Sequence, residues 1–443
     1  MNTMSAAWDT LAIQSLGECK VANPLPYCRF VSDATLLRMN VPEEDLPEPT
    51  EELVYCDFQM AGPREKIYFD PSKVKCAIVT CGGLCPGIND VIRSIVMEAF
   101  HNYNIASCVG IRYGLQGFIP KYQHDLMELT PRSVADIHQF GGTILGSSRG
   151  SQPVDQIVDA LERMNVSILF VIGGDGTMRA AKAIQQEVAA RGRKIGVIGI
   201  PKTIDNDINF VSKSFGFDTA VEKATEAIDC AHTEAVGAYN GIGLVKLMGR
   251  EAGFIAAQSV LALKEVNFVL VPEQRFDFEG ENGLLPALER RLKSRKHAVI
   301  VAAEGAGQDH TGQSGEKDAS GNVKLGDISD VLMARIKGYF AKRDMPITIK
   351  YIDPSYIIRS VPANSNDRVY CGFLGQHALH AAMAGKTGMV VSRMQDRYVH
   401  LPMELVTDKR KRLNLRSDYW RSVLESTGQD PITNIFRDQT CLS

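Results

Sequence analysis

The 443-residue sequence has no long hydrophobic run, no strong net charge and no regular cysteine spacing. A membrane helix needs roughly 20 consecutive apolar residues, and no apolar run reaches that length. The amino terminus lacks a basic segment followed by an apolar one, so we expect no signal peptide. A net charge of −3 gives no electrostatic reason to expect a nucleic-acid partner.

The ten cysteines do not form a disulfide framework. Their scattered positions are typical of reduced thiols, so we expect a cytoplasmic protein. Cys81 and Cys85 flank a glycine-rich turn, but a single pair lacks the further ligands that a zinc site requires. We interpret both as structural thiols.

The composition is that of a globular enzyme, with 44% hydrophobic and 23% charged residues. This length exceeds one ordinary core, so two or more domains are expected. Residues 41–53 contain three prolines and six acidic residues, which excludes a regular helix or a central strand there. We therefore expect residues 1–70 to form either an extension that wraps the surface or a neighbouring subunit, or a partly disordered arm.

From residue 74 onward, predicted strands alternate with predicted helices, which indicates an α/β fold with largely parallel sheets. The expected strands are residues 74–80, 105–111, 166–172, 195–200, 241–247, 268–271, 298–303, 347–352 and 388–391. The expected helices are residues 89–100, 178–190, 218–235, 281–295, 328–340, 368–383 and 419–425.

Three of the early strands run directly into loops rich in glycine or polar residues. They carry Gly82-Gly83, the sequence GGDGT at 173–177, and PKTIDND at 201–207. Backbone N–H groups of a glycine loop and a following helix start can bind an anion. Because parallel strands present reactive groups at their carboxyl ends, we expect the three loops to meet over one phosphate-transfer site.

Asp175 lies within the second of these loops, where phosphates would be held. A carboxylate beside phosphates requires a metal between them, and Mg²⁺ prefers such oxygen ligands. The alternative is a helix-capping aspartate, for which the flanking glycines are not needed. Arg149, in the polar loop GSSRG at 146–150, is either a solvated surface residue or a group that binds phosphate oxygens.

Later strands end in groups that suit a phosphorylated polyol. Arg250, Glu304, Tyr356 and Arg359 each follow a predicted strand. Arginine binds phosphate, and glutamate accepts hydrogen bonds from hydroxyl groups. Together with the early loops, these residues predict a kinase for a sugar phosphate.

The motifs GGLCPGIND, GSSRG, GGDGT, PKTIDND, LMGRE, AAEG and YIIR occur in this order between about residues 74 and 400. In that order they resemble the 6-phosphofructokinase family. The resemblance implies two similar α/β domains with the active site in the cleft between them. It implies a nucleotide-binding domain at 71–235, a sugar-phosphate-binding domain at 236–400 and a tail at 401–443 that packs back on the body.

The resemblance also implies roles for individual residues. Asp205 resembles the general base that accepts the proton of the fructose 1-hydroxyl, with Lys202 and Thr203 beside it, and Asp175 resembles the Mg²⁺ ligand. The nucleotide contacts implied are Gly82, Arg149, Gly150, Gly174, Asp175, Gly176 and Thr177. The implied fructose 6-phosphate contacts are Thr203, Ile204, Asp205, Met248, Gly249, Arg250, Glu304, Tyr356, Ile357, Ile358 and Arg359.

The phosphoryl donor is either ATP or pyrophosphate. Pyrophosphate-using members resemble GGDD where this chain has Gly176, whose missing side chain leaves room for the rest of a nucleotide. Lys202 resembles the pyrophosphate enzymes instead, since the familiar bacterial ATP enzymes have glycine there. The mixed pattern is similar to an ATP-using branch found in plants and trypanosomes, so we expect ATP as co-substrate with Mg²⁺.

Two positions depart from the bacterial ATP enzymes. Gly241 and Lys350 stand where those enzymes have arginines that reach the sugar phosphate of an adjacent subunit. We expect a homo-oligomer, a dimer or tetramer, in which Lys350 can retain part of that contact and Gly241 cannot.

Two rival functions share only part of this pattern. A GGDGT-type kinase for NAD or a lipid would have that one motif and would lack PKTIDND, LMGRE and YIIR. A non-catalytic nucleotide sensor would keep the fold but would lack Asp175 or Asp205. Both carboxylates are present in this chain, so the sequence favours an active kinase.

Overall fold

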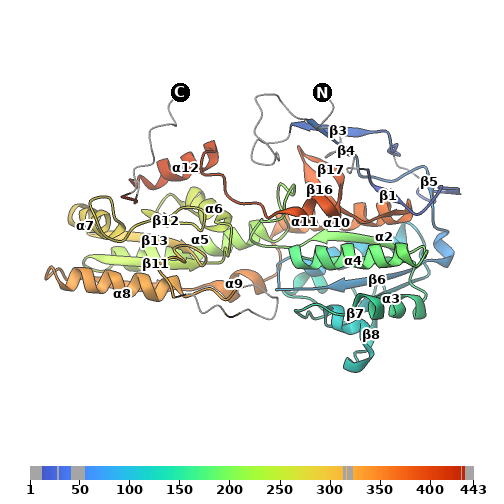
Figure 1. Ribbon diagram of the computed structural model, residues 1–443, viewed down its shortest axis with the longest axis horizontal. Helices are drawn as coiled ribbons and strands as arrows, with labels where there is room; N and C mark the ends of the chain where they lie inside the picture. Colours follow the sequence, from blue (N-terminus) through green and yellow to red (C-terminus); the bar gives the residue numbers. More distant parts are fainter. Residues whose placement is uncertain are drawn as a thin grey trace. The chain divides into compact units, whose positions relative to one another are not determined.

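The protein is described by a computed structural model that covers residues 12–26, 29–40, 55–312, 316, 323–430 and 432–434. Contacts divide the chain into two compact units. The first comprises Met1–Thr203, Ile208–Gly216 and Ser360–Arg410, and the second comprises Ile204–Asp207, Phe217–Arg359 and Lys411–Ser443. Each unit is built on its own largely parallel sheet with helices packed against it (Figure 1).

The sheet of the first unit has seven strands in the order β17-β16-β10-β9-β6-β7-β8. The five central strands are parallel, and β17 and β8 run antiparallel at the two edges. The strands are β6 (Lys75–Thr80), β7 (Ser107–Ile111), β8 (Leu126–Glu128), β9 (Ile168–Gly173), β10 (Gly196–Pro201), β16 (Met389–Met394) and β17 (Arg397–Pro402).

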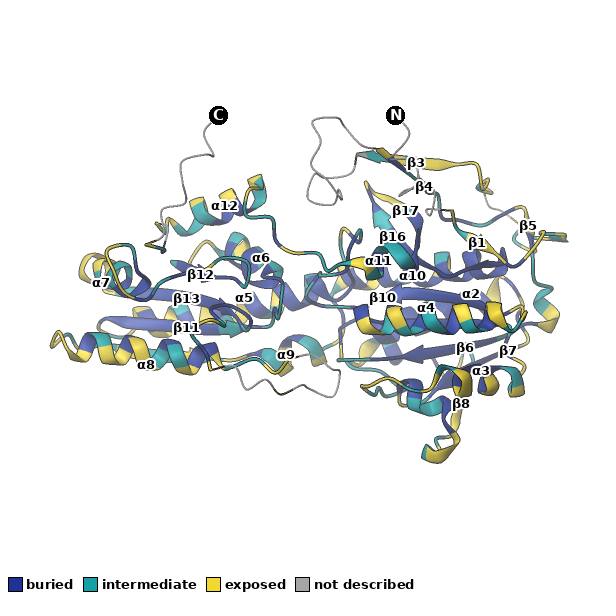
Figure 2. Cartoon of the chain, viewed as in Figure 1, coloured by how far each residue is buried: buried dark blue, intermediate teal, exposed yellow. Residues whose placement is uncertain are grey.

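Helices pack against this sheet, so the central strands are buried (Figure 2). The helices are α2 (Ile88–His101), α3 (Val154–Arg163), α4 (Asp175–Ala190), α10 (Ser365–Met383) and α11 (Met403–Asp408). Short 3-10 helices lie at Pro71–Lys73, Gly114–Phe118, Pro120–Tyr122 and Ile137–Gln139. Leu169 and Val171 of β9 lie in one core with Ile157 and Leu161 of α3. Phe170, which lies between them in the strand, is also fully buried. Burial of successive residues explains why these strands read as continuous apolar runs.

The second unit has four parallel strands in the order β12-β13-β11-β14. They are β11 (Gly241–Leu247), β12 (Phe268–Leu270), β13 (His297–Ala303) and β14 (Thr348–Ile352). The helices are α5 (Phe217–Val236), α6 (Phe254–Leu263), α7 (Leu284–Arg295), α8 (Ile328–Ala341), α9 (Ser355–Ser360) and α12 (Asp418–Thr427). Leucines of α7 and Ile328, Leu332 and Ile336 of α8 form one core with β11 and β13.

The α/β fold with largely parallel sheets is confirmed, and each predicted strand and helix lies within a few residues of an observed one. The antiparallel edge strands β8 and β17 and helices α3, α6, α9 and α11 were not expected. Contacts group residues 360–410 with the first unit, whereas the predicted sugar-phosphate domain extended to residue 400. The assignment of a ligand to each domain stays a prediction.

The described part of residues 1–70 packs on the first unit. Strands β1 (Gln14–Ser15), β2 (Val21–Ala22), β3 (Leu36–Asn40), β4 (Tyr55–Gln59) and β5 (Lys66–Ile67) lie here, and β1 pairs with β15 (Lys386–Thr387). The acidic, proline-containing segment 41–53 lies outside the described residues.

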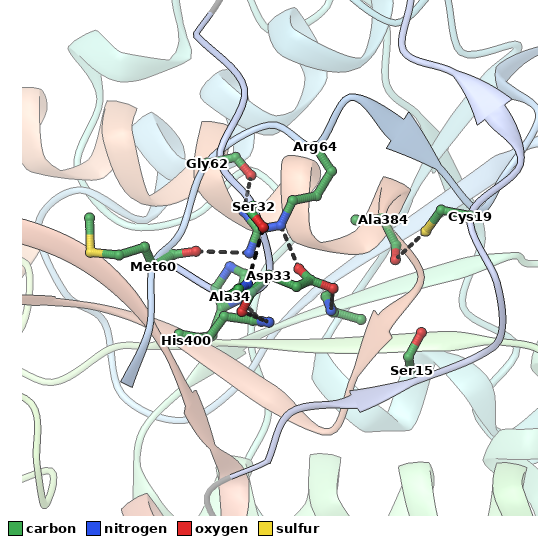
Figure 3. A network of polar contacts seen from close by, with 12 residues as sticks. Ser15, Cys19, Ser32, Asp33, Ala34, Met60, Gly62, Arg64, Ala384 and His400 are labelled. Atoms are coloured by element: carbon green, nitrogen blue, oxygen red, sulfur yellow. Dashed lines mark hydrogen bonds and ion pairs between the residues drawn. The ribbon is translucent and has the colours of Figure 1, made fainter. Parts of the chain in front are cut away.

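An ion-pair network, in which Arg64 and Lys386 are buried and Asp33 is exposed, anchors this extension (Figure 3). The Arg64 guanidinium donates to Asp33 at 2.7 Å and to the carbonyl oxygens of Met60 and Gly62 at 2.8 Å. Lys386 pairs with the other Asp33 oxygen at 2.6 Å. The extension is thus part of the folded body rather than an independent arm over the residues that the structure describes.

Among the described helices, none has the length and apolar character required to span a membrane.

Cys81 and Cys85 are buried, and burial raises the pKa of the Cys81 thiol to about 12. Within the described part of the chain, no three His, Cys, Asp or Glu side chains cluster as a metal site.

Candidate active site

Three predicted loops begin side by side at the carboxyl edge of the first sheet, because β6, β9 and β10 are neighbours. The Cys81 N–H donates to the carbonyl oxygen of Ile172 at 2.9 Å. The Lys202 N–H donates to that of Gly173, also at 2.9 Å. The sheet therefore brings together residues that lie more than a hundred positions apart in the sequence.

The first glycine loop also holds the GSSRG segment in place. Gly82 has a φ of +86°, which only glycine adopts without strain. Its N–H donates to the carbonyl of Ser148 at 3.2 Å, and the Ser147 hydroxyl donates to the Gly82 carbonyl at 2.7 Å. Arg149 follows directly and is exposed, as is Gly150. The loop thus presents the arginine to solvent next to Gly82.

The GGDGT segment forms the start of α4. Gly174 is the residue at the N-cap, and no side chain caps the helix there, so Asp175 does not act as a capping residue. A Cβ at Gly173 would lie 2.5 Å from the Cβ of Thr177, so this glycine is required by close packing. A Cβ at Gly176 would meet no atom within 4 Å. The absence of a side chain at Gly176 is therefore not required by the fold.

The Asp175 carboxylate is buried, with 8% of the residue exposed. Its Oδ2 atom forms an ion pair with Arg179 at 2.9 Å and accepts a hydrogen bond from Arg410 at 3.4 Å. Its Oδ1 atom is buried and has no hydrogen-bond partner among the described residues. A buried carboxylate oxygen that accepts no hydrogen bond fits a divalent cation, since Mg²⁺ is bound by one or two carboxylates plus phosphate oxygens and waters.

Lys202 places a positive charge at the same sheet edge. The residue is 5% exposed, and its ammonium donates to the carbonyl oxygen of Gly83 at 2.7 Å. A Cβ built at Gly82 would lie 3.4 Å from Lys202 Nζ, so the lysine lies directly behind the first glycine loop. A cation held here can neutralise negative charge on a phosphoryl group.

The rest of the PKTIDND segment is a tight turn. Ser214 donates its hydroxyl hydrogen to the Thr203 carbonyl at 2.5 Å, and Asn206 adopts a left-handed conformation with a φ of +55°. Residues Ile204–Asp207 are grouped with the second unit, where the Lys411 N–H donates to the Asp207 carbonyl at 2.9 Å. Ile204 is buried, whereas Asp205 is half-buried.

A second set of predicted residues meets at the carboxyl edge of the second sheet, where β13, β11 and β14 are neighbours. The Glu304 N–H donates to the Leu247 carbonyl at 2.8 Å, and the Gly305 N–H donates to the Gly249 carbonyl at 3.1 Å. Met248 and Arg250 flank Gly249, which has a φ of +134°. Glu304 and the LMGR segment are thus joined through the backbone.

Burial raises the pKa of the Glu304 carboxyl above its ordinary value, against the opposing charges of Arg250, Lys246 and Arg359. Titratable groups with shifted pKa values are typical of binding and catalytic sites. The Arg250 guanidinium also donates to the Val323 carbonyl oxygen. The two side chains place an acceptor of hydroxyl hydrogens and a cation at one sheet edge.

The YIIR segment forms the short helix α9 after β14. Tyr356 and Ile357 are 74% and 62% exposed, whereas Ile358 is fully buried. The Arg359 guanidinium lies over the Tyr356 ring, 4.9 Å from its centroid. Tyr356 and Arg359 are therefore available to a ligand, and Ile358 anchors the helix in the core.

The two departures from the bacterial pattern have a structural basis. A Cβ at Gly241 would lie 2.1 Å from the Ala235 carbonyl oxygen, so no larger residue fits without a backbone shift. Lys350 pairs with Glu234 at 2.9 Å. In this unit, the packing of α5 against β11 excludes an arginine at position 241.

Three residues of these sites were missed from the sequence. Arg179 could have been found, since it lies one helical turn after Asp175. Arg410 and Lys246 carry no local signal, because they reach their carboxylate partners only through the fold.

Residues 75–382 match the phosphofructokinase family. A Borreliella burgdorferi protein named ATP-dependent 6-phosphofructokinase is 50% identical over 434 residues, covering 94% of this chain and 96% of the relative. A Trypanosoma cruzi protein of the same name is 46% identical over 372 residues, covering 83% of this chain and 76% of the relative.

Among solved structures, the pyrophosphate-dependent phosphofructokinase of Marinobacter aquaeolei matches with a TM-score of 0.67. The match covers 82% of this chain and 94% of that chain at 19% identity, which establishes the fold alone. Together, the family match and the high identity to full-length relatives show that this chain belongs to the phosphofructokinase family.

Proposed function

We propose that this protein phosphorylates the 1-hydroxyl of D-fructose 6-phosphate with ATP, giving fructose 1,6-bisphosphate and ADP in glycolysis. The observation that carries the proposal is the meeting of Gly82, Asp175 and Lys202 at one sheet edge, in a chain that is 50% identical to a relative named ATP-dependent 6-phosphofructokinase. An anion-binding loop, a metal carboxylate and a buried cation are the parts that phosphoryl transfer requires.

On the donor side, we assign the nucleotide phosphates to the first sheet edge. The start of α4 offers backbone N–H groups beside the Gly82 turn, and Arg149 is exposed on the loop that contacts Gly82. Gly150, Gly174 and Thr177 complete the expected nucleotide contacts. The open space beside Gly176 favours a nucleotide, because it leaves room beyond the transferred phosphoryl group.

On the acceptor side, we assign the sugar phosphate to Arg250, Arg359 and Tyr356, with Glu304 accepting from a sugar hydroxyl. The Asp205 carboxylate accepts the proton of the 1-hydroxyl while the oxygen of that hydroxyl bonds to the γ-phosphorus of ATP. The bond from that phosphorus to the β,γ-bridging oxygen breaks, and ADP leaves. Lys202 neutralises charge on the group in transit.

The residues present fit a Mg²⁺ ion, which Asp175 would hold through its buried Oδ1 atom. When bound, the ion would supply charge neutralisation between the phosphates. We expect Asp175→Asn to weaken binding of Mg²⁺–ATP by about tenfold or more, while leaving metal-free ATP binding nearly unchanged, because an amide carries no charge to offset the ion. Isothermal titration with ATP, with and without Mg²⁺, measures both affinities.

Glu187→Gln on the same helix serves as the matched control, since Glu187 pairs with Arg191 away from Asp175. Equal loss of affinity for the two forms of ATP in the Asp175→Asn variant would show that Asp175 does not hold the ion.

Pyrophosphate is the alternative donor, and the specific observation in its favour is Lys202, which resembles the pyrophosphate-using members. An assay of the purified protein with each donor decides between them. We expect turnover with ATP, and at least about a hundredfold lower kcat/KM with pyrophosphate, because the open space beside Gly176 and the ATP-dependent relatives both favour the nucleotide. Turnover with pyrophosphate but not with ATP would exclude the ATP assignment.

The proposal also includes a cytoplasmic enzyme that forms a homodimer or homotetramer. Reduced cysteines support that location, since all eight described cysteines are free thiols. Sedimentation of the purified protein measures the assembly, and a monomer at working concentration would contradict this part of the proposal.

A further inference from the structure

Lys246 holds two carboxylates at the edge of the second sheet. It is the residue before Leu247, at the end of β11, and its side chain is only 15% exposed. Its ammonium lies 2.9 Å from Asp327 Oδ2 and 3.1 Å from Asp353 Oδ2. One half-buried cation therefore joins two exposed carboxylates, which are separated in the sequence by helix α8 and strand β14.

Each of these aspartates caps the start of a helix with its other oxygen. Asp327 Oδ1 accepts from the Ser329 N–H at 2.9 Å, at the N-terminus of α8. Asp353 Oδ1 accepts from the Ser355 N–H at 3.0 Å and from the Ser355 hydroxyl, at the start of α9. Lys246 thus neutralises the two caps without occupying the oxygens that bind the helix ends.

Burial and ion pairing have opposite effects on the pKa values of Lys246, Asp327 and Asp353. Burial alone would raise the pKa of Asp353, but hydrogen bonds from Ser355 and Lys246 outweigh it and hold the pKa below its ordinary value. The same balance of burial against Ser329 and Lys246 lowers the pKa of Asp327. Burial would lower the pKa of Lys246, yet the two carboxylates raise it. All three groups are therefore charged at neutral pH.

The start of helix α9 is held by this cap, and most of the helix side chains are not buried. Only Ile358 of its six residues is buried, and Tyr356 and Ile357 point largely into solvent. The Tyr351 hydroxyl lies 3.0 Å from the Ser329 hydroxyl and 3.5 Å from Asp353, which extends the same network. A helix of six residues is marginal by itself, so its orientation follows from its cap and its one anchor.

From this geometry we propose that Lys246 is a positioning residue for fructose 6-phosphate binding. By neutralising Asp353, it fixes the start of α9 and thereby the directions in which Tyr356 and Arg359 meet the sugar phosphate. The inference rests on the proposed function, because it requires α9 to contact the substrate. Lys246 acts through Asp353 and does not touch the substrate.

The test is the Lys246→Met variant, which keeps the length of the side chain and removes its charge. We expect the KM for fructose 6-phosphate to rise about tenfold, with kcat and the KM for ATP changed less than about twofold, because only ground-state binding of the sugar phosphate is disturbed. Fructose 6-phosphate titration without ATP should show the same loss. Lys246→Arg, which can still contact both carboxylates, should restore most of the affinity.

A matched control separates this effect from loss of an ion pair in general. Lys293→Met removes a lysine that pairs with Glu289 at 2.7 Å on α7, away from the sheet edge, and it should leave both KM values unchanged. Thermal unfolding of each variant measures any stability change.

Asp353→Ala tests the path of the effect and supplies a second variant if Lys246→Met does not fold. Asp353→Ala should also raise the KM for fructose 6-phosphate. The Lys246→Met/Asp353→Ala double variant should have a KM no higher than that of the more impaired single variant, since both changes act on one cap. Additive losses, or an unchanged fructose 6-phosphate KM in Lys246→Met, would overturn the inference. Failure of the proposed function is distinguishable, because the wild-type protein would then show no turnover of fructose 6-phosphate.

Discussion

Replacing Asp205 with alanine should lower kcat by about a thousandfold or more and leave fructose 6-phosphate binding largely intact. General-base catalysis contributes roughly 10²- to 10⁴-fold to a rate, and the 1-hydroxyl would lose its proton acceptor. Asp205 is half-buried on the PKTIDND turn, whose backbone is held by hydrogen bonds to the carbonyl oxygens of Thr203 and Asp207. Steady-state kinetics measure the rate, and titration with fructose 6-phosphate measures binding.

Asp205→Asn is the near-isosteric companion and should behave in the same way, since an amide cannot accept the proton at neutral pH. Asp229→Asn on the exposed face of α5 controls for the loss of one negative charge, and it should leave kcat and fructose 6-phosphate binding unchanged. A kcat within tenfold of wild type in both Asp205 variants would refute the assignment of Asp205 as the base.

Replacing Gly176 with aspartate should lower kcat/KM for ATP by about a hundredfold or more. A carboxylate at this position would face the nucleotide's phosphates, where like charges in a partly desolvated site repel each other by several kcal/mol. A Cβ at 176 meets no atom within 4 Å, and an acidic residue in the first turn of α4 suits the helix dipole. The variant should therefore fold normally, so the loss reports on the donor site.

Kinetics with ATP, pyrophosphate and fructose 6-phosphate measure this prediction, and the KM for the sugar phosphate should stay near its wild-type value. Gly338→Asp in α8 is the control, because a Cβ there also meets nothing within 4 Å. An unchanged KM for ATP would show that residue 176 does not line the donor site. New turnover with pyrophosphate would show that this position alone selects the donor.

Much of the fold could be predicted because hydrophobic periodicity is local. The strands at 168–173, 196–201 and 297–303 were found as continuous apolar runs, which their burial on both faces explains. The edge strand β17 was missed, since it pairs antiparallel with β16 and has no run of that kind. Helix α9 was not predicted, because its six residues carry too little periodicity to identify a helix.

The sequence by itself determined the family, the order of the motifs and the identity of the reactive groups, because these depend on residue types and spacing. Only the tertiary structure decided which groups meet. Parallel pairing of β6, β9 and β10 brings Gly82, Asp175 and Lys202 to one sheet edge. Arg410 reaches Asp175 across 235 residues. Asp175 looked from the sequence like either a cap or a metal ligand, and its uncapped place at the start of α4, with one buried oxygen that accepts no hydrogen bond, favours the ligand. Such contacts are set by sheet order and chain crossing, which no local pattern records.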